Sequence, residues 1–362
     1  MDMTVNRLPA PTWNWLRVNE GSLRGVSVPV RGPIEMETPD TISYSYYNKE
    51  EKNFPADIPG AVGTDLDALL EQSEAGFHGW EIAAGVKESA PVRLHFSYET
   101  GKSVQNRIAV HACENSEITV IMDFCQAEAA DTVQTPAVAE PQGNFAAVQT
   151  KIRAERGARV HLVQIQKLPE DFTFLNDVGT SCAENVQIET TQIVLGGGET
   201  YMGMRTDLRA KASSLASRIG YLLDKKELLD MNYLAVHTGA KTTSRMDVSG
   251  VLRGESKKLF RGTIDFRNGS IGAKGDEKED ALLFSEGVVN RTIPLILCEE
   301  EDVEGNHGAT IGRLDEALLF YLASRGIEEQ EIYEMMARAR IDAICSEIRD
   351  EKTRELVQGY LA

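Results

Sequence analysis

At 362 residues, with 42% apolar and 26% charged side chains, the chain has the composition of a globular protein and can bury one large core or two modest ones. Its net charge of −18 argues against binding to nucleic acid or to an anionic membrane surface. The N-terminus lacks an apolar signal segment, no apolar run approaches the roughly 18 residues that cross a bilayer, and no two of the five cysteines form a CxxC pair. We therefore expect a reduced, cytoplasmic protein without a disulfide framework or a structural zinc site.

The first segment, residues 1–88, is predicted to be irregular and helical. Seven prolines fall within its first 60 residues and exclude long elements there. Three leucines at helical spacing then predict a short helix over 65–74. These leucines are Leu66, Leu69 and Leu70. Near the start of the chain, Trp13 and Trp15 are interpreted as anchors that hold the N-terminus on the core.

A predicted β core follows over residues 89–312, because the apolar pattern there changes to a period of two. In the stretch 118–124, for example, the apolar residues at every second position are Ile118, Val120, Met122 and Phe124. The strands are separated by small Gly-, Asn- and Asp-rich turns without amphipathic helices, which fits either a β-sandwich or a β-solenoid. We favour the solenoid, since a small turn followed by a strand recurs without the even spacing of a sandwich. A helical segment, residues 313–362, ends the chain.

Within the C-terminal segment, Asp315 can cap a helix over 315–324, and Gly326 is a plausible left-handed stop. A second helix is predicted over 328–349, and a third begins near Lys352. The first of these helices contains seven consecutive apolar residues, so all its sides are apolar. It is therefore buried either within this chain or, on one face, against a partner subunit.

Few residues of the chain suggest chemistry. His307 is predicted to lie in a Gly/Asn-rich turn, where it is either an ordinary surface histidine or a metal contact. Cys298 ends an apolar strand and is expected to be a buried, inert thiol, whereas Cys345 is expected to pack within a helix. Two acidic groups could serve a glycosidase, a lyase or a Ca²⁺ site, but such charge runs are usually solvated loops. They are Glu277, Glu279 and Asp280, and the run Glu299 to Asp302. No catalytic constellation is visible, so we do not expect an enzyme.

The stretch from His307 to Ile327 carries a composite signature. It reads HGATIG, then LD, then FYLASRGI. This pattern resembles the C-terminal signature of the SufB/SufD family, the paired scaffold subunits of the SUF iron–sulfur cluster assembly machine. The resemblance implies a right-handed parallel β-helix core with a flanking N-terminal segment and C-terminal helices. It also implies pairing with a SufB-type subunit through the last β strands.

In proteins of this family the helices that follow Gly312 dock a SufC-type ABC ATPase, which carries out the ATP hydrolysis. The residues that the resemblance assigns to this docking are Phe320, Tyr321, Arg325 and Gly326. His307 would face the partner subunit at a shared site of nascent cluster assembly and is the candidate metal contact. The isolated chain is expected to bind no stable cofactor; a transient iron–sulfur cluster would form in the complex, and flavin binding is left open. A homodimer is also possible when the chain is alone, because its final strands could pair with a copy of themselves.

Two departures from SufB-type sequences indicate a SufD-type chain. Lys278 to Asp280 stand where SufB-type proteins carry a cysteine, and Gly308 replaces a glutamate after the motif histidine. Gly305 stands where some SufD proteins have a cysteine, which argues against independent binding of a cluster. The competing hypothesis is a stand-alone β-solenoid, a carbohydrate-active or Ca²⁺-binding protein that uses its acidic loops.

Overall fold

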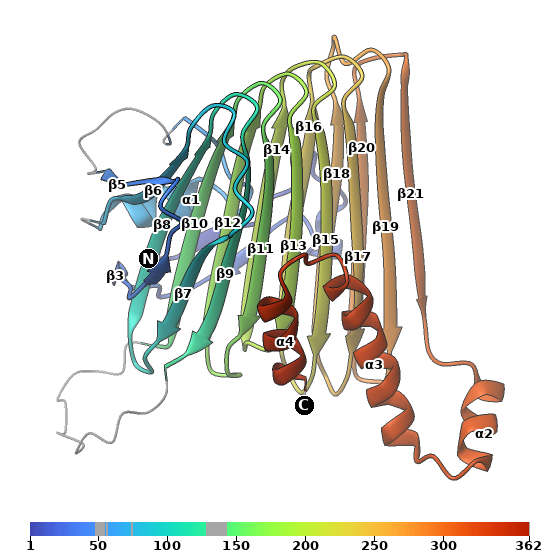
Figure 1. Ribbon diagram of the computed structural model, residues 1–362. Helices are drawn as coiled ribbons and strands as arrows, with labels where there is room; N and C mark the ends of the chain where they lie inside the picture. Colours follow the sequence, from blue (N-terminus) through green and yellow to red (C-terminus); the bar gives the residue numbers. More distant parts are fainter. Residues whose placement is uncertain (48–54, 56, 74, 128–142, 362) are drawn as a thin grey trace, which may run out of the picture.

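The computed structural model describes residues 1–47, 55, 57–73, 75–127 and 143–361. In this part of the chain, successive long strands alternate between two sheets, and each pairs in parallel with the strand two places along the chain (Figure 1). Each coil therefore adds one strand to either sheet, which is the construction of a parallel β-solenoid. The mainly β solenoid predicted from the sequence is confirmed.

The elements have the following bounds. The first sheet contains β3 (Val30–Arg31), β5 (Ser43–Tyr47), β6 (Phe77–Ile82), β8 (Ser103–Ala112), β10 (Phe145–Ala154), β12 (Thr173–Cys182), β14 (Glu199–Leu208), β16 (Leu228–His237), β18 (Lys257–Phe266) and β20 (Val289–Cys298). The second sheet contains β4 (Glu35–Glu37), β7 (Val92–Tyr98), β9 (Glu117–Gln126), β11 (Arg159–Lys167), β13 (Gln187–Leu195), β15 (Ser214–Leu223), β17 (Thr243–Leu252), β19 (Ala273–Leu283) and β21 (Val303–Gly312). A small sheet pairs β1 (Met3–Val5) with β2 (Gly21–Leu23), and the helices are η1 (Asn14–Leu16), α1 (Thr64–Glu71), α2 (Glu316–Ser324), α3 (Glu329–Cys345) and α4 (Glu351–Tyr360).

The interior of the solenoid is built by the alternation seen in the sequence, because successive side chains of a strand point to opposite faces. In β9, the buried inward positions are Ile118, Val120, Met122 and Phe124. The ring centroid of Phe124 lies 5.0 Å from that of Phe96 and 5.1 Å from that of Phe174. Apolar side chains of neighbouring coils therefore stack along the axis and hold adjacent coils in register.

The N-terminal segment lies along the outer face of the first sheet, which is thus covered on both sides. Its backbone N–H groups at Ala61 and Val62 donate to the Asp177 carboxylate, at 2.8 and 3.0 Å. Farther along the sheet, Asn6 donates to the carboxylate of Asp230 at 2.8 Å. These contacts place polar side chains of the sheet under the segment, where each has a partner.

Two details of this segment differ from the sequence analysis. Short strands occupy much of the segment, which was predicted to be irregular and helical. The helix predicted from the leucine spacing is present as α1, and Leu66, Leu69 and Leu70 are buried as predicted. The two tryptophans do not anchor the N-terminus, because Trp13 and Trp15 are 73% and 75% exposed.

The C-terminal helices α3 and α4 pack on the outer face of the second sheet, whereas α2 projects beyond it (Figure 1). Contact with the sheet is close: a Cβ at Gly220 of β15 would lie 2.9 Å from the Ile344 side chain of α3. Neither these helices nor the others in the described residues are long and apolar enough to span a bilayer.

Candidate functional site

The solenoid is open at its C-terminal end. Strands β20 and β21 are the last members of the two sheets, and within the described residues each pairs with one neighbour, β18 or β19. Most of β21 is exposed. An uncovered edge strand offers a row of backbone N–H and C=O groups to another chain. At this end both sheets therefore present unpaired strand edges within the described residues.

His307 lies in the middle of this edge strand and not in a turn, as the sequence analysis had it. Its register partner in β19 is Glu277. Paired residues of parallel strands share a face, and Glu277 is buried inside the solenoid. The side chain of His307 therefore lies on the inward-facing side of the last coil. It is exposed because no further coil covers this open end of the solenoid.

Directly beneath the last coil lies a buried charged layer. Lys258 of β18 forms an ion pair with Glu279 of β19, and its ammonium also donates to the hydroxyl of Thr292 at 3.0 Å. Thr292 in turn donates to Glu279. Burial lowers the pKa of Lys258, while the charge of Glu279 acts in the opposite direction. Lys258 was not predicted to belong to this site, although its position in phase with the inward Phe260 was a signal in the sequence.

Glu277 has a different environment from Glu279, its neighbour on the same face. Burial raises the pKa of Glu277 to about 7, and the adjacent charge of Glu279 adds to this effect. Its Oε2 atom is buried and has no hydrogen-bond partner among the residues that the structure describes. The prediction that Glu277 and Glu279 form a solvated loop was wrong, because both are buried in β19. A carboxyl group close to half-ionised at neutral pH therefore lies one coil below His307.

The cysteine of this end also differs from expectation. Cys298 ends β20 and is exposed, and its thiol donates to the carbonyl oxygen of Glu300 at 3.1 Å. The apolar run that precedes it does not bury it, because the strand is the last of its sheet. Cys345, in contrast, is buried in α3, as predicted.

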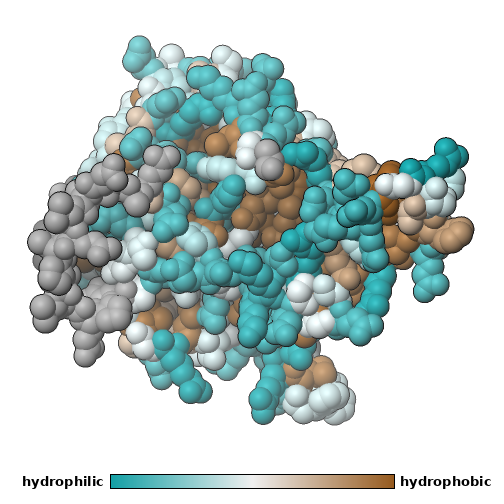
Figure 2. Space-filling model, turned by 90° about the horizontal axis from the view of Figure 1, so that it is seen from below, coloured by the Kyte–Doolittle hydropathy of each residue, from teal (hydrophilic) through white to brown (hydrophobic). Residues whose placement is uncertain are grey.

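Helix α2 presents an apolar surface to solvent. Its start and stop are those predicted: Asp315 accepts a hydrogen bond from the Ala317 N–H at 3.0 Å, and Gly326 has a φ of +85°. None of its residues is buried in the described structure, and Phe320 and Tyr321 are 77% and 53% exposed. Within the described residues, the chain therefore covers this helix on one face only, where Leu319 and Leu322 are partly buried. Figure 2 shows apolar atoms on the projection at the right, where α2 lies.

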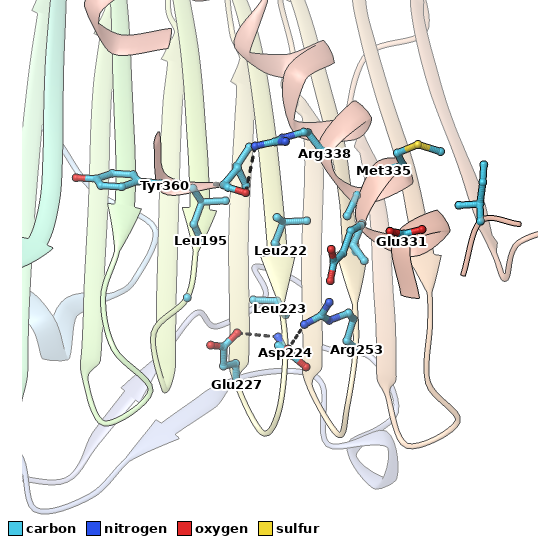
Figure 3. Close-up of a pocket in the computed structure, with 16 residues that line it drawn as sticks. Leu195, Leu222, Leu223, Asp224, Glu227, Arg253, Glu331, Met335, Arg338 and Tyr360 are labelled. Carbon is cyan, nitrogen blue, oxygen red and sulfur yellow. Dashed lines mark hydrogen bonds and ion pairs between the residues drawn. The ribbon is translucent and has the colours of Figure 1, made fainter. Parts of the chain in front are cut away.

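The Arg325 guanidinium lies over the ring of Tyr321, 5.2 Å from its centroid. The structure thus brings Phe320, Tyr321, Arg325 and Gly326 together at one end of α2, and it places His307 separately on the preceding strand. Between α3, α4 and the second sheet lies a pocket of about 850 Å³, lined by apolar residues such as Leu222 and by an Asp224–Arg253 ion pair (Figure 3). No cysteine or histidine is among its lining residues, so we do not assign it to the cluster chemistry.

Comparison with known proteins agrees with this architecture. Residues 95–340 match the family model for the SUF system FeS cluster assembly SufBD core domain. The chain is 27% identical to the iron–sulfur cluster assembly protein SufD of Escherichia coli over 48% of this chain and 41% of that protein. It is 19% identical to SufD of Bacillus subtilis over 81% of this chain and 64% of that protein.

A third relative, an iron–sulfur cluster assembly SufBD family protein of Mycobacterium leprae, is 33% identical over 33% of this chain and 14% of that protein. The chain thus spans less than two thirds of the length of each of these three relatives. The family model, in contrast, covers more than half of the chain, including most of the solenoid. With this match and its similarity to SufD proteins, the chain belongs to the SufB/SufD family of iron–sulfur cluster assembly proteins and is of the SufD type.

Proposed function

We propose that this chain is a non-catalytic, cytoplasmic scaffold subunit of the SUF system. It would pair with a SufB-type subunit through the open end of its solenoid and bind a SufC-type ATPase through α2. The observation that carries this proposal is the exposed terminal coil. There β20 and β21 lack outer neighbours in the described chain, and His307 lies on the inward-facing side of β21. A second solenoid could extend both sheets across this end.

The ATPase contact is supported by α2. Burying two exposed aromatic rings such as Phe320 and Tyr321 releases enough apolar surface from water to stabilise a complex by a few kcal/mol. The helix follows β21 after three residues, Arg313 to Asp315. A rotation of α2 by its partner would therefore act directly on the strand that contains His307. Such a coupling requires that the ATPase bind two arrangements with different affinities.

At the shared end, His307 would supply an imidazole nitrogen to iron or to a nascent cluster, which is the cargo of the complex. Glu277 lies one coil below and could accept a proton released by a ligand, since its pKa of about 7 keeps both of its forms populated at neutral pH. The buried Lys258–Glu279 pair holds the layer beneath in place. The remaining ligands would come from the partner subunit.

The test is co-expression of the tagged chain with the SufB-type and SufC-type proteins of the same host, followed by affinity capture and mass determination. Replacing both Phe320 and Tyr321 by aspartate should remove the ATPase and retain the SufB-type subunit. Ala309→Arg changes an exposed residue on the same inward-facing side of β21 as His307. It should remove the SufB-type subunit and retain the ATPase. Ile271→Asp, which alters an exposed apolar residue outside both surfaces, is the matched control.

His307→Ala should leave the complex intact and lower cluster assembly in cells. Recovery of the tagged chain alone in every experiment would refute the pairing, and unchanged cluster assembly in the His307 variant would refute its assigned role. The alternative of a stand-alone carbohydrate or Ca²⁺ protein keeps only the surface run Glu299 to Asp302, because Glu277 and Glu279 are buried and cannot be surface ligands.

A further inference from the structure

A second group of reactive side chains lies far along the solenoid from His307. His95 is in β7, and Asp123 and Cys125 are in the adjacent strand β9, where the parallel register pairs His95 with Asp123. All three alternate with buried inward residues such as Phe124, so they share the outer face of the second sheet.

The three side chains form a linear arrangement. His95 Nδ1 lies 2.9 Å from Asp123 Oδ2, and His95 Nε2 lies 3.7 Å from Cys125 Sγ. Asp123 is 8% exposed, and the hydroxyl of Tyr360 in α4 donates to its two oxygens at 3.2 and 3.3 Å. The carboxylate is therefore held in place, and it orients the imidazole so that the other ring nitrogen faces the thiol. This is the order of groups in a thiol nucleophile, its base and the residue that positions the base.

A metal site is the other arrangement that His, Asp and Cys can make, and these three ligand atoms do lie within 4.8 Å of one another. One imidazole, however, offers one nitrogen to one ion. Here Nδ1 faces Asp123 and Nε2 faces Cys125, so an ion bound by all three residues would require the ring to leave its hydrogen bond. Proton transfer from the thiol to the imidazole requires no such rearrangement.

The thiol and the imidazole both line a surface groove that contains several charged side chains. A groove of about 1000 Å³ contacts both His95 and Cys125. Lys167 is the register partner of Cys125 in β11, and its ammonium lies 4.7 Å from the centroid of the Tyr360 ring. Burial raises the pKa of Asp123, and the neighbouring imidazole of His95 partly offsets this shift. Burial also raises the pKa of Tyr360, so its phenol stays protonated and remains a hydrogen-bond donor. The other charged residues near this face are Glu170, Lys225 and Glu227 in the groove and the Arg93–Asp350 pair.

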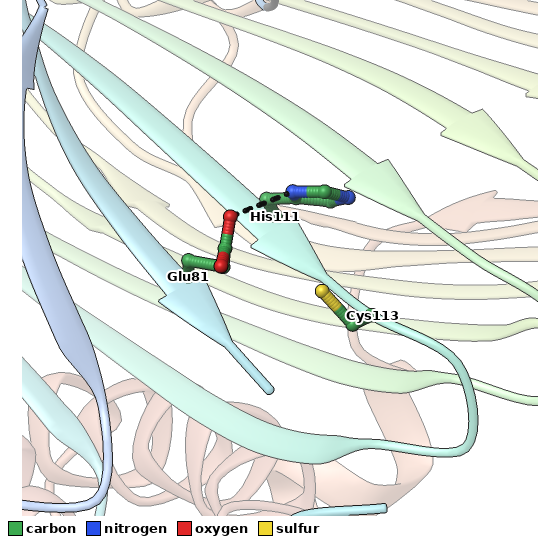
Figure 4. A group of neighbouring side chains, drawn as sticks. All are labelled: Glu81, His111 and Cys113. Carbon is green, nitrogen blue, oxygen red and sulfur yellow. Dashed lines mark hydrogen bonds and ion pairs between the residues drawn. The ribbon is translucent and has the colours of Figure 1, made fainter. Parts of the chain in front are cut away.

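Within the described residues, neither Cys113 nor Cys298 has an imidazole nitrogen placed as the base for its thiol, as Cys125 has. Near Cys113, the imidazole of His111 faces Glu81 at 3.3 Å through Nδ1 (Figure 4). Its Nε2 lies 2.9 Å from Glu155, so carboxylates occupy both nitrogens. Burial, followed by those two carboxylates, raises the pKa of Cys113. Cys298 is more exposed than Cys125, but its thiol donates to the backbone carbonyl of Glu300 and not to an imidazole.

We propose that Cys125 is a nucleophilic thiol with His95 as its base and Asp123 as the positioning residue, and that its substrate is divalent sulfur in a disulfide or a persulfide. His95 Nε2 takes the thiol proton, and the thiolate attacks one sulfur of the substrate. An S–S bond to Cys125 forms while the S–S bond of the substrate breaks, and the leaving thiolate takes the proton from the imidazolium. The exchange needs no further oxidant or reductant. It requires a thiolate and a proton donor for the leaving group, which are the functions these residues supply.

The test uses the full chain, treated with EDTA, and 4,4′-dithiodipyridine as the disulfide probe, with the rate followed at pH 6 and the modified residue identified by peptide mass. An ordinary thiol is about 0.3% ionised at pH 6. Full ionisation would increase the thiolate fraction about 300-fold, and the lower nucleophilicity of an acidic thiol would offset about half of this gain on a logarithmic scale. We therefore expect Cys125 to react about tenfold faster than Cys298 at pH 6, despite its lower exposure.

Cys125→Ser should abolish the fast phase, and Cys298→Ser should leave it unchanged. His95→Gln and Asp123→Asn should slow it about tenfold at pH 6, and the rate of the His95 variant should recover at pH 9, where solvent ionises the thiol. A merely structural role of His95 would not give this recovery. Faster labelling of Cys298 at pH 6, or a His95→Gln rate equal to that of the unmodified chain, would overturn the proposal. A low-molecular-weight persulfide in place of the probe distinguishes the two sulfur sources.

Discussion

Glu277 makes the stability of the solenoid depend on pH in a direction opposite to that of most carboxylates. Its folded-state pKa is about 7, against an ordinary value of 4.5. Between these values the folded state binds more protons than the unfolded state, so the folded state loses stability as the pH rises. The resulting loss in the free energy of unfolding is small below pH 4.5 and reaches its full size above pH 7. Replacing Glu277 by glutamine, which has nearly the same shape and cannot ionise, should remove it.

The size of the effect follows from the shift in pKa. Integrated between pH 5 and pH 8, this loss of folding free energy grows by about 2–3 kcal/mol. With the usual entropy of unfolding per residue, this corresponds to about 3 °C in Tm for a chain of this length. We therefore expect Glu277→Gln to raise Tm about 3 °C more at pH 8 than at pH 5, relative to the unmodified chain at each pH.

The assay is thermal unfolding followed by circular dichroism at the two pH values. Glu304→Gln is the matched control, because Glu304 is exposed and its ion pair with Lys274, at 2.8 Å, should contribute little at either pH. Glu279→Gln should lower Tm at both pH values, since it leaves Lys258 buried without its carboxylate. An equal change in Tm for Glu277→Gln at pH 5 and pH 8 would show that Glu277 is already ionised, and would refute the reasoning.

Three further changes test the packing. Asp230→Asn leaves the buried guanidinium of Arg261 without its carboxylate and should lower the free energy of unfolding in urea by about 3–5 kcal/mol; a loss below 1 kcal/mol would contradict this. Gly203→Ala places a Cβ 2.3 Å from the backbone nitrogen of Val62, so limited proteolysis should cleave the N-terminal segment sooner, whereas unchanged cleavage would refute the contact. Burial lowers the pKa of His237 to about 4, so the unfolded state takes up the proton first as the pH falls below 6.5 and stability is lost. Between pH 6.5 and pH 4, the free energy of unfolding in urea should therefore fall by about 3 kcal/mol less for His237→Gln than for the unmodified chain. An equal fall in both proteins would contradict the lowered pKa of His237.

The sequence was most informative where local patterns determine structure. The period of two in the core places alternate residues of a strand inside or outside, whichever strand is its neighbour. The ends of α2 could be predicted from Asp315 and Gly326, because a cap and a left-handed stop act within one turn of the helix.

The predictions that failed depend on contacts distant in the chain. Gly305 beside His307 suggested a turn, but it is small because a Cβ there would lie 3.1 Å from Ile296 and Phe266. Glu279 looked solvated because its partner, Lys258, lies 21 positions earlier, on the other sheet. Cys298 was expected to be buried because its strand is apolar, and nothing local in the sequence marks that strand as the last of its sheet.

The N-terminal segment also has a consequence for the order of folding. A solenoid can form coil by coil as the chain emerges, since each coil contacts mainly its neighbours. Asn6, however, hydrogen bonds to Asp230, 224 positions later, and the carbonyl of Val18 accepts from Arg261, 243 positions later. The residues made first during synthesis therefore acquire their binding surface only after β16 and β18 exist. Once docked, they join early and late coils into one cooperative unit, so a lesion in β18 should loosen the opposite terminus of the chain.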